Sequence, residues 1–305
     1  MYSIVVPVYN GEETVCNLFE KTNDFFKKIK VNYEMIFVHD YGPDNSWNEL
    51  LKLKKNNPDV VKIIKLTRNF GQHNAIICGI EHSSGEFIIT MDEDLQHNPF
   101  DIQILIDKQF ENNYDVVYGK YEERKHSFFR NIGSSLLKRM ISKGIPDIHP
   151  DYSAFRLIKS DIAKSLINMQ NSYTFLDGYI SWITTNCASC IVSHSDRQGG
   201  VSSYNFKKLV NHTINIFVTF SNYPLRLLVN ISILIFILNI VFSTFIIFRK
   251  LIYDDFALGF PSLIITIGFG VSLIMLSIGV IGEYIYRINL KTTKKPNYFS
   301  IKEYE

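Results

Sequence analysis

Strand-like and helix-like segments alternate along the first 119 residues of the chain. Short apolar runs such as YSIVVPV and YEMIFV have the length of buried strands, and the segments between them repeat apolar residues at helical spacing. Alternation of this kind predicts an α/β fold, a mostly parallel sheet with helices on both faces. Ligands bind such sheets at the carboxyl ends of the strands. The sequences VYN, VHD, RNFG and MDEDLQ should therefore meet at one edge.

The acidic triplet Asp92, Glu93 and Asp94 directly follows the strand-like run FIITM. One interpretation is a polar turn, because Asp is depleted in strands and frequent in turns. The other is a metal site, because carboxylates at i and i+2 beyond a strand end can bind a hard cation that also takes phosphate oxygens. The triplet alone leaves both interpretations open.

Two later segments, residues 227–248 and 256–282, contain no charged residue. Each exceeds the roughly 20 helical residues that cross a bilayer. Two membrane spans are predicted; the alternative is a pair of buried core helices, which seldom exceed about 14 apolar residues. The basic residues after the second span, by the positive-inside rule, place both termini in the cytoplasm and the short connector outside. No signal peptide is apparent before the first strand, so the catalytic domain of a multi-pass inner-membrane protein is expected on the cytoplasmic side.

The chain is thus expected to contain four regions. Residues 1–205 form the α/β domain, 206–224 an amphipathic interfacial segment, 225–288 the two-helix transmembrane region, and 289–305 a basic cytoplasmic tail. The interfacial segment has lysines on one side and apolar residues on the other, which is typical of a helix lying in the membrane interface. An ordinary surface helix packed on the sheet is the alternative.

The four cysteines do not indicate a disulfide framework in a cytoplasmic domain. Cys187 and Cys190 form a CxxC pair, but no second pair completes a tetrahedral metal site. The surrounding sequence is typical of a strand, in which residues i and i+3 point to opposite faces. A redox or zinc function for this pair is therefore not expected.

Several motifs occur in a characteristic order: SIVVPVYN, FVHDYGPDNSW, LTRNFGQHNAIICGI, TMDEDLQHNP, RQGGVSSY and GVIGEYIYRI. In this order, and followed by a basic tail, they resemble the family 2 glycosyltransferases that load a sugar onto a polyisoprenyl phosphate. Dolichol-phosphate mannosyltransferases, bactoprenol glucosyltransferases and undecaprenyl-phosphate aminoarabinose transferases are of this kind. The resemblance runs over nearly the whole chain. It implies a nucleotide-sugar-binding GT-A-like domain followed by interfacial helices and two transmembrane helices.

The resemblance also implies roles at the donor site. Asp92 and Asp94 match the family's DxD motif and are expected to bind Mg²⁺ or Mn²⁺ and the diphosphate, with Gln96 near the sugar or a metal-bound water and Glu93 a bystander. The remaining nucleotide-sugar contacts implied are Pro7, Tyr9, Glu12, Asp40, Arg68 and Gly71. Arg68 taken alone is equally compatible with a surface salt bridge. The family's DDGS is HDYG here, so His39 and Tyr41 depart from the pattern.

The acceptor phosphate is expected to bind a second, basic set of residues. By resemblance these are Lys120, Arg130, Ser134 and Arg197, and Arg130 is also counted as catalytic. Arg130 and Ser134 lie at i and i+4, on one face of a predicted helix. Asp151 matches a family acid, and its role is open between catalytic base, sugar orientation and a structural cap, since Ala154 stands where relatives often have a second acid.

These motifs together predict inverting, metal-dependent transfer of a sugar from a nucleotide-diphosphate sugar, expected to be a UDP-sugar, to undecaprenyl phosphate or a similar lipid. The expected partners are that donor, the lipid and the membrane, without nucleic acid, and homo-oligomer formation is left open. Two alternatives remain: transfer to a hydroxyl of a lipid-linked glycan, which needs a carboxylate base, and a non-catalytic membrane scaffold.

Overall fold

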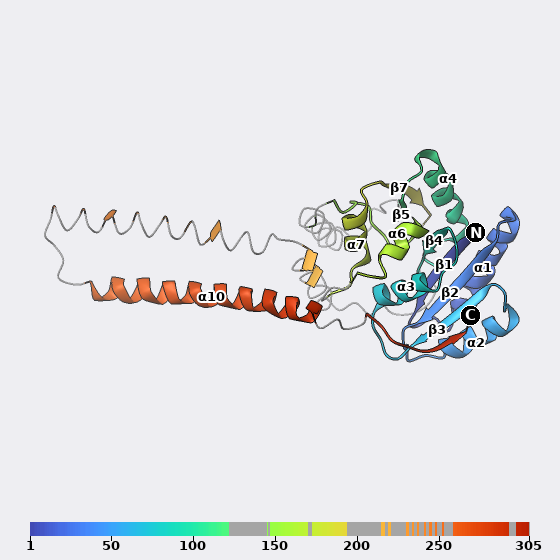
Figure 1. Cartoon of the computed structure of the whole chain (residues 1–305), viewed down its shortest axis with the longest axis horizontal. Coiled ribbons are helices and arrows are strands. Elements are labelled where there is room, and N and C mark those ends of the chain that lie inside the picture. Colours follow the sequence, from blue (N-terminus) through green and yellow to red (C-terminus); the bar gives the residue numbers. More distant parts are fainter. Residues whose placement is uncertain are drawn as a thin grey trace.

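The computed structural model describes residues 1–121, 145, 147–169, 173–193, 259–292 and 297–304, together with isolated positions between 215 and 252. The elements follow one another largely as the alternation predicts (Figure 1). In chain order they are β1 (Tyr2–Val8), α1 (Val15–Ile29), β2 (Tyr33–His39), α2 (Ser46–Asn56), β3 (Val61–Leu66), α3 (Gln72–Glu81), β4 (Phe87–Thr90), η1 (Pro99–Asp101), α4 (Ile102–Asn112), β5 (Val116–Tyr121), β6 (Arg156–Lys159), α6 (Ser160–Ser165), α7 (Leu176–Ile183), β7 (Cys187–Val192), α10 (Phe260–Thr292) and β8 (Ser300–Tyr304).

The strands form one sheet in the order β7-β5-β6-β4-β1-β2-β3-β8. The four central strands β4, β1, β2 and β3 are mutually parallel, so their carboxyl ends share one edge. Strand β6 runs antiparallel between β4 and β5. The predicted mostly parallel sheet is confirmed, and the loops after β1, β2, β3 and β4 meet where a ligand site is expected.

Helices cover both faces of the sheet, because the inner strands are apolar on both sides. In β1, Ile4 and Val6 pack with α1, α2 and α4, while Val5 packs with α3, α6 and α7. The same alternation separates Cys187 and Cys190 onto opposite faces of β7. Burial raises the pKa of each thiol to about 11. Both cysteines are thus partly buried, each packed against a different core cluster.

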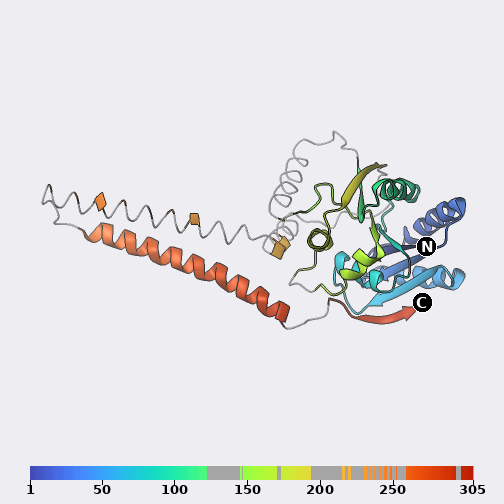
Figure 2. The ribbon, with the colours of Figure 1, turned by 45° about the horizontal axis from the view of Figure 1, so that its top comes forward.

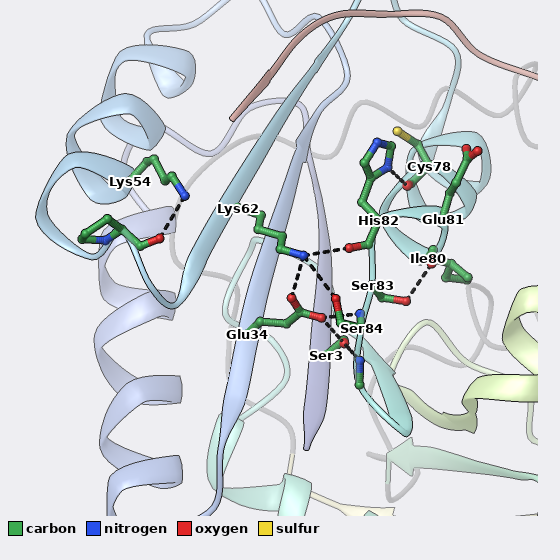
Figure 3. Close-up of polar contacts among 12 residues, drawn as sticks. Ser3, Glu34, Lys54, Lys62, Cys78, Ile80, Glu81, His82, Ser83 and Ser84 are labelled. Carbon is green, nitrogen blue, oxygen red and sulfur yellow. Dashed lines mark hydrogen bonds and ion pairs between the residues drawn. The ribbon is translucent and has the colours of Figure 1, made fainter. Parts of the chain in front are cut away.

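A buried polar network fastens the opposite, amino-terminal edge of the sheet (Figure 3). The carboxylate of Glu34 accepts hydrogen bonds from Ser3 Oγ at 2.6 Å and from the backbone N–H of Ser84 at 2.5 Å. Lys62 Nζ lies 3.0 Å from its other oxygen. The network joins the first residues of β1, β2 and β3 to the loop before β4. The amino-terminal edge of the sheet is thus fixed by structural contacts, whereas loops form the opposite edge, where the ligand site is expected.

Helix α10 extends away from the α/β domain (Figures 1 and 2). It includes most of the second uncharged segment, whereas most of the first lies outside the described residues. Counting only described residues, no helix has both the length and the apolar character needed to cross a membrane. The two spans stay predictions.

After α10 the chain returns to the domain, where β8 pairs antiparallel with the edge strand β3. Residues 300–304, predicted only as part of a basic tail, thus add the eighth strand of the sheet.

Candidate active site

Asp40, at the end of β2, holds the loop that begins α3. Its two carboxylate oxygens accept the backbone N–H groups of Phe70 and Gly71 at 2.7 and 2.9 Å. Gly71 has φ of +89°, a left-handed conformation that favours glycine. Burial raises the pKa of Asp40 to about 6, although both hydrogen bonds act to lower it. Asp40 therefore shapes the RNFG loop, and its predicted contact with the nucleotide base stays a prediction.

The two departures from the family's DDGS pattern have separate structural effects. His39 points to the other face of the sheet from Asp40, where its ring lies 5.7 Å from that of Trp47. Burial, and then the charge of Lys65, lowers the pKa of His39 to about 4, so it is neutral at pH 7. Tyr41 has φ of +55°, the conformation that a glycine at this place adopts without strain. The backbone turn is thus kept without the glycine.

Glu12 and Asp44 fasten the loop after β1 to the loop after β2. The N–H of Glu12 donates to Asp44 Oδ2 at 2.9 Å, and the N–H of Asn45 donates back to Glu12 Oε2 at 3.1 Å. Between them, a Cβ on Gly42 would lie only 1.5 Å from the carbonyl oxygen of Tyr9. The two loops therefore form one surface at the strand ends, and Glu12 supports it with both its backbone N–H and its carboxylate.

Glu93, expected to be a bystander in donor binding, makes a structural contact at the ligand edge. Its Oε1 accepts the backbone N–H of Tyr9 at 3.4 Å, which links the acidic triplet to the end of β1. Burial raises the pKa of Glu93, and the neighbouring charge of Asp94 adds to the rise. The sequence offers no local signal for this contact, because 84 residues separate the two partners.

Asp92 and Asp94 lie just beyond β4 on a tight turn. Leu95 has φ of +61°, and the turn lets the N–H of Gln96 donate to Asp94 Oδ1 at 3.1 Å. A left-handed conformation in a non-glycine residue costs about 1–3 kcal/mol and is common at functional sites. Asp92 Oδ1 accepts a hydrogen bond from Gln72 Nε2 at 2.6 Å. Gln72, at the start of α3, is thus a site residue that the sequence did not reveal.

The two aspartates fit a divalent cation. Among the described residues there is no group of three or more His, Cys, Asp or Glu side chains that could hold a metal alone. An ion such as Mg²⁺ commonly takes only one or two protein carboxylates and completes its coordination with phosphate oxygens and water. Asp92 and Asp94 therefore match a cation that binds together with a phosphorylated ligand.

The other donor-site candidates lie on the same edge. Pro7 is buried within β1, and Tyr9 is exposed just after it. Arg68 is exposed, and its guanidinium carbon lies 4.7 Å from the ring centre of Phe70. Arg68 forms no ion pair with another described residue. The surface salt bridge considered from the sequence is therefore not formed within the described part of the chain.

Lys120 and Asp151 form an ion pair at the end of β5, with 3.1 Å between Nζ and Oδ2. Ser189 Oγ on the neighbouring strand β7 donates to the same oxygen at 2.8 Å. Burial acts to raise the pKa of Asp151, but the hydrogen bonds from Ser189 and Lys120 and the lysine charge outweigh it and lower the pKa. Asp151 is thus a stabilised anion and a weak base. The predicted residues Arg130, Ser134 and Arg197 lie outside the described residues.

A mostly parallel α/β sheet with paired carboxylates beyond a central strand is the arrangement expected of a GT-A-like glycosyltransferase. The model of the family "Glycosyl transferase family 2" matches residues 3–165. The chain belongs to this family, and it is a glycosyltransferase.

Two relatives match over almost the whole chain. The "Putative glycosyltransferase CsbB" of Bacillus subtilis (strain 168) is 32% identical over 307 residues, which cover 99% of this chain and 92% of that protein. The "Undecaprenyl-phosphate 4-deoxy-4-formamido-L-arabinose transferase" of Proteus mirabilis (strain HI4320) is 31% identical over 300 residues, covering 97% and 92%.

A solved structure supports the fold. Glucosyl-3-phosphoglycerate synthase from Mycobacterium tuberculosis, in complex with Mn²⁺, UDP-glucose and phosphoglyceric acid, aligns with a TM-score of 0.52 at 12% identity. The alignment covers 72% of this chain and 78% of that one.

Proposed function

We propose that the protein transfers a sugar from a nucleotide-diphosphate sugar, a UDP-sugar, to undecaprenyl phosphate or a similar polyisoprenyl phosphate, with inversion at the sugar carbon. The observation that carries the donor half is the pair Asp92 and Asp94 beyond β4, with Gln72 hydrogen-bonded to Asp92. The acceptor half draws on the similarity to the P. mirabilis transferase, which extends over 97% of this chain.

The donor must lose a nucleoside diphosphate when the bond to its sugar breaks. A Mg²⁺ or Mn²⁺ held by Asp92 and Asp94 would act as a Lewis acid toward the phosphate oxygens of this leaving group. Gln72 keeps Asp92 oriented, and the turn at Leu95 keeps Asp94 beside it. The loops fastened by Asp40 and Glu93 form the adjoining surface, which suits the nucleotide.

The state of Asp151 favours a phosphate over a hydroxyl as acceptor. A hydroxyl must lose a proton, and a base works best when its pKa lies near the working pH. Asp151 instead has a lowered pKa and is paired with Lys120. A phosphate monoester is already largely ionised at neutral pH, so it needs a cation to position it more than a base. Lys120 supplies such a charge at the end of β5.

The membrane part of the proposal uses the two uncharged segments of the sequence, residues 227–248 and 256–282. They would anchor the domain at the cytoplasmic face, where the phosphate of a membrane lipid is within reach. Extraction of the membrane fraction at alkaline pH tests this: an anchored protein stays with the bilayer, and release into the supernatant contradicts the anchor.

Radiolabelled nucleotide sugars offered with undecaprenyl phosphate in detergent test the reaction. The full-length protein is compared with Asp94→Asn, each with Mg²⁺, Mn²⁺ or EDTA. We expect a lipid product that needs the cation and falls about 10²-fold or more in the variant. Asp59→Asn, a matched change at an exposed residue before β3, should keep full turnover. Donor binding without lipid product from any sugar would contradict the acceptor and favour a glycan hydroxyl. Equal turnover in Asp94→Asn would contradict the metal site.

A further inference from the structure

The inner face of α7 is tied to the strand that ends at the metal carboxylates. Asp177 of α7 forms a buried ion pair with Arg156 of β6, whose side chain is only 1% exposed. Arg156 Nε also donates to Thr90 Oγ1 at 3.1 Å, and Thr90 Oγ1 donates to the carbonyl oxygen of Ala154 at 2.7 Å. Thr90 is the last residue of β4, two positions before Asp92. A shift of α7 would therefore displace the end of β4 through these contacts.

The outer face of α7 carries a segment from much later in the chain. Phe220 is 5% exposed, and its ring centre lies 4.9 Å from that of Trp182 and 5.6 Å from that of Tyr179. Ile216, one helical turn earlier, is 1% exposed in the same core cluster. A Cβ on Gly178 would lie 2.6 Å from two ring carbons of Phe220, so this close contact requires glycine.

The segment that carries Ile216 and Phe220 contacts α10 on its other side. Arg287 of α10 donates to Thr219 Oγ1 at 3.0 Å and to Asn215 Oδ1 at 3.4 Å. Asn215 and Thr219 precede Ile216 and Phe220 by one residue each, so the two pairs face different neighbours at the same i, i+4 spacing. Figures 1 and 2 both show the described residues 215–216 and 219–220, the orange fragments nearest the domain, between α7 and the near end of α10.

We propose that α7 is a positioning element that holds α10 and the metal carboxylates in one fixed geometry, with the contact between Gly178 and Phe220 as its joint. The purpose of this fixed geometry rests on the proposed function, transfer to a lipid phosphate. A lipid whose chain is held in a bilayer presents its phosphate at one depth and orientation, so the site must meet it there. The fixed joint makes α10 an orienting part of the enzyme and not a loose tether.

Gly178→Ala in the full-length protein tests the joint, with Gly279→Ala as the matched control. Gly279 lies on α10, and a Cβ there would meet no atom within 4 Å. Hydrogen exchange of the amides in residues 215–220 and 284–292 reports the joint without any need for activity. We expect exchange to speed up about tenfold or more in Gly178→Ala and to be unchanged in the control.

Turnover is then measured with undecaprenyl phosphate in phospholipid vesicles and with a short, water-soluble prenyl phosphate. Misplacement of about 1 Å can lower a rate by about 10²-fold. We expect Gly178→Ala to lose roughly 10- to 100-fold with the bilayer acceptor. Turnover with the soluble acceptor and the KM for the nucleotide sugar should stay within about twofold of the intact protein. Adding Phe220→Leu, which removes ring atoms from the clash, should restore most of the loss.

Unchanged exchange and unchanged bilayer turnover would overturn the proposal. So would an equal loss with both acceptors, because that result describes damage to the domain and not to its orientation. Should Gly178→Ala fail to fold, Arg287→Gln breaks the same connection from the α10 side and should give the same split between acceptors. If the intact protein makes no lipid product, the proposed function fails, whereas the exchange measurement still decides whether α7 holds α10.

Discussion

The carboxylate of Asp40 should make donor binding depend on pH near 6. Its ionised form accepts the N–H groups of Phe70 and Gly71. The protonated acid carries a hydrogen on one oxygen, so one of these two N–H groups loses its acceptor and the loop loosens. With a pKa of about 6, about one molecule in eleven is ionised at pH 5. If the donor binds the ionised form only, its apparent Kd should rise about tenfold between pH 7 and pH 5.

Calorimetric titration with an intact nucleotide sugar and a fixed excess of Mg²⁺ measures this shift. An intact nucleotide sugar is required, because its diphosphate is esterified at both ends and does not titrate in this range, whereas a free nucleoside diphosphate does. Asp40→Asn is the control, and it should bind weakly with an affinity that varies little between pH 5 and pH 8. An inflection near pH 6 that persists in Asp40→Asn, or a flat curve in the intact protein, would refute the reasoning.

As the pH falls from 7 to 5, the free energy of unfolding should rise while the affinity for the donor falls. This opposite trend distinguishes the effect of Asp40 from acid unfolding. Folding raises the pKa of Asp40 from 3.8 to about 6, so protonation favours the folded state. The buried charge thus lowers stability by about 3 kcal/mol at neutral pH. That penalty should disappear as the pH falls through 6 toward 3.8. A protein that binds its donor less tightly at pH 5 while resisting urea better has not lost affinity by unfolding.

Two further changes test the two edges of the sheet. Glu34→Gln should lower the free energy of unfolding by about 1–3 kcal/mol, because the buried acceptor loses the charge that Lys62 pairs with. Burial acts to raise the pKa of Glu34, but its hydrogen bonds and Lys62 lower the pKa below 4.5. This contribution should therefore be complete at neutral pH and be lost as the pH falls from 4.5 through that lowered value. Urea unfolding followed by tryptophan fluorescence measures it, and an equal difference at pH 3 and pH 7 would contradict it. Gly42→Ala should weaken donor binding about tenfold or more, because the new Cβ would meet the Tyr9 carbonyl oxygen at 1.5 Å and force the two loops apart; unchanged affinity by calorimetry would show that these loops do not form the donor surface.

The sequence predicted the elements that depend on local patterns. Apolar runs and helical periodicity located β1 to β5 and α1 to α4, and the rule for strand ends brought Asp92, Asp94 and Asp40 to one edge. These successes share a cause, since each needs only neighbouring residues and a general rule for parallel sheets.

Contacts between distant residues could not be predicted in this way. Gln72 reaches Asp92 across 20 positions and Glu93 reaches Tyr9 across 84. Strand β8 is five residues long, and it pairs with β3, whose last residue is Leu66. Nothing in FSIKEY distinguishes it from a polar tail, because a short edge strand is defined by the partner it meets.

The acidic residues at the ligand edge have two different roles, to fix loops and to bind a cation, and the sequence alone does not distinguish them. A site for a diphosphate should avoid negative charge, yet Glu12, Asp40, Asp44 and Glu93 all lie near it. Each of the four accepts hydrogen bonds from backbone N–H groups of neighbouring loops, which both orders those loops and offsets the charge. Asp92 and Asp94 instead meet side-chain and turn donors beyond β4, where a cation can bridge them to an anion. An acidic loop edge is thus compatible with an anionic donor, provided that only this pair faces it.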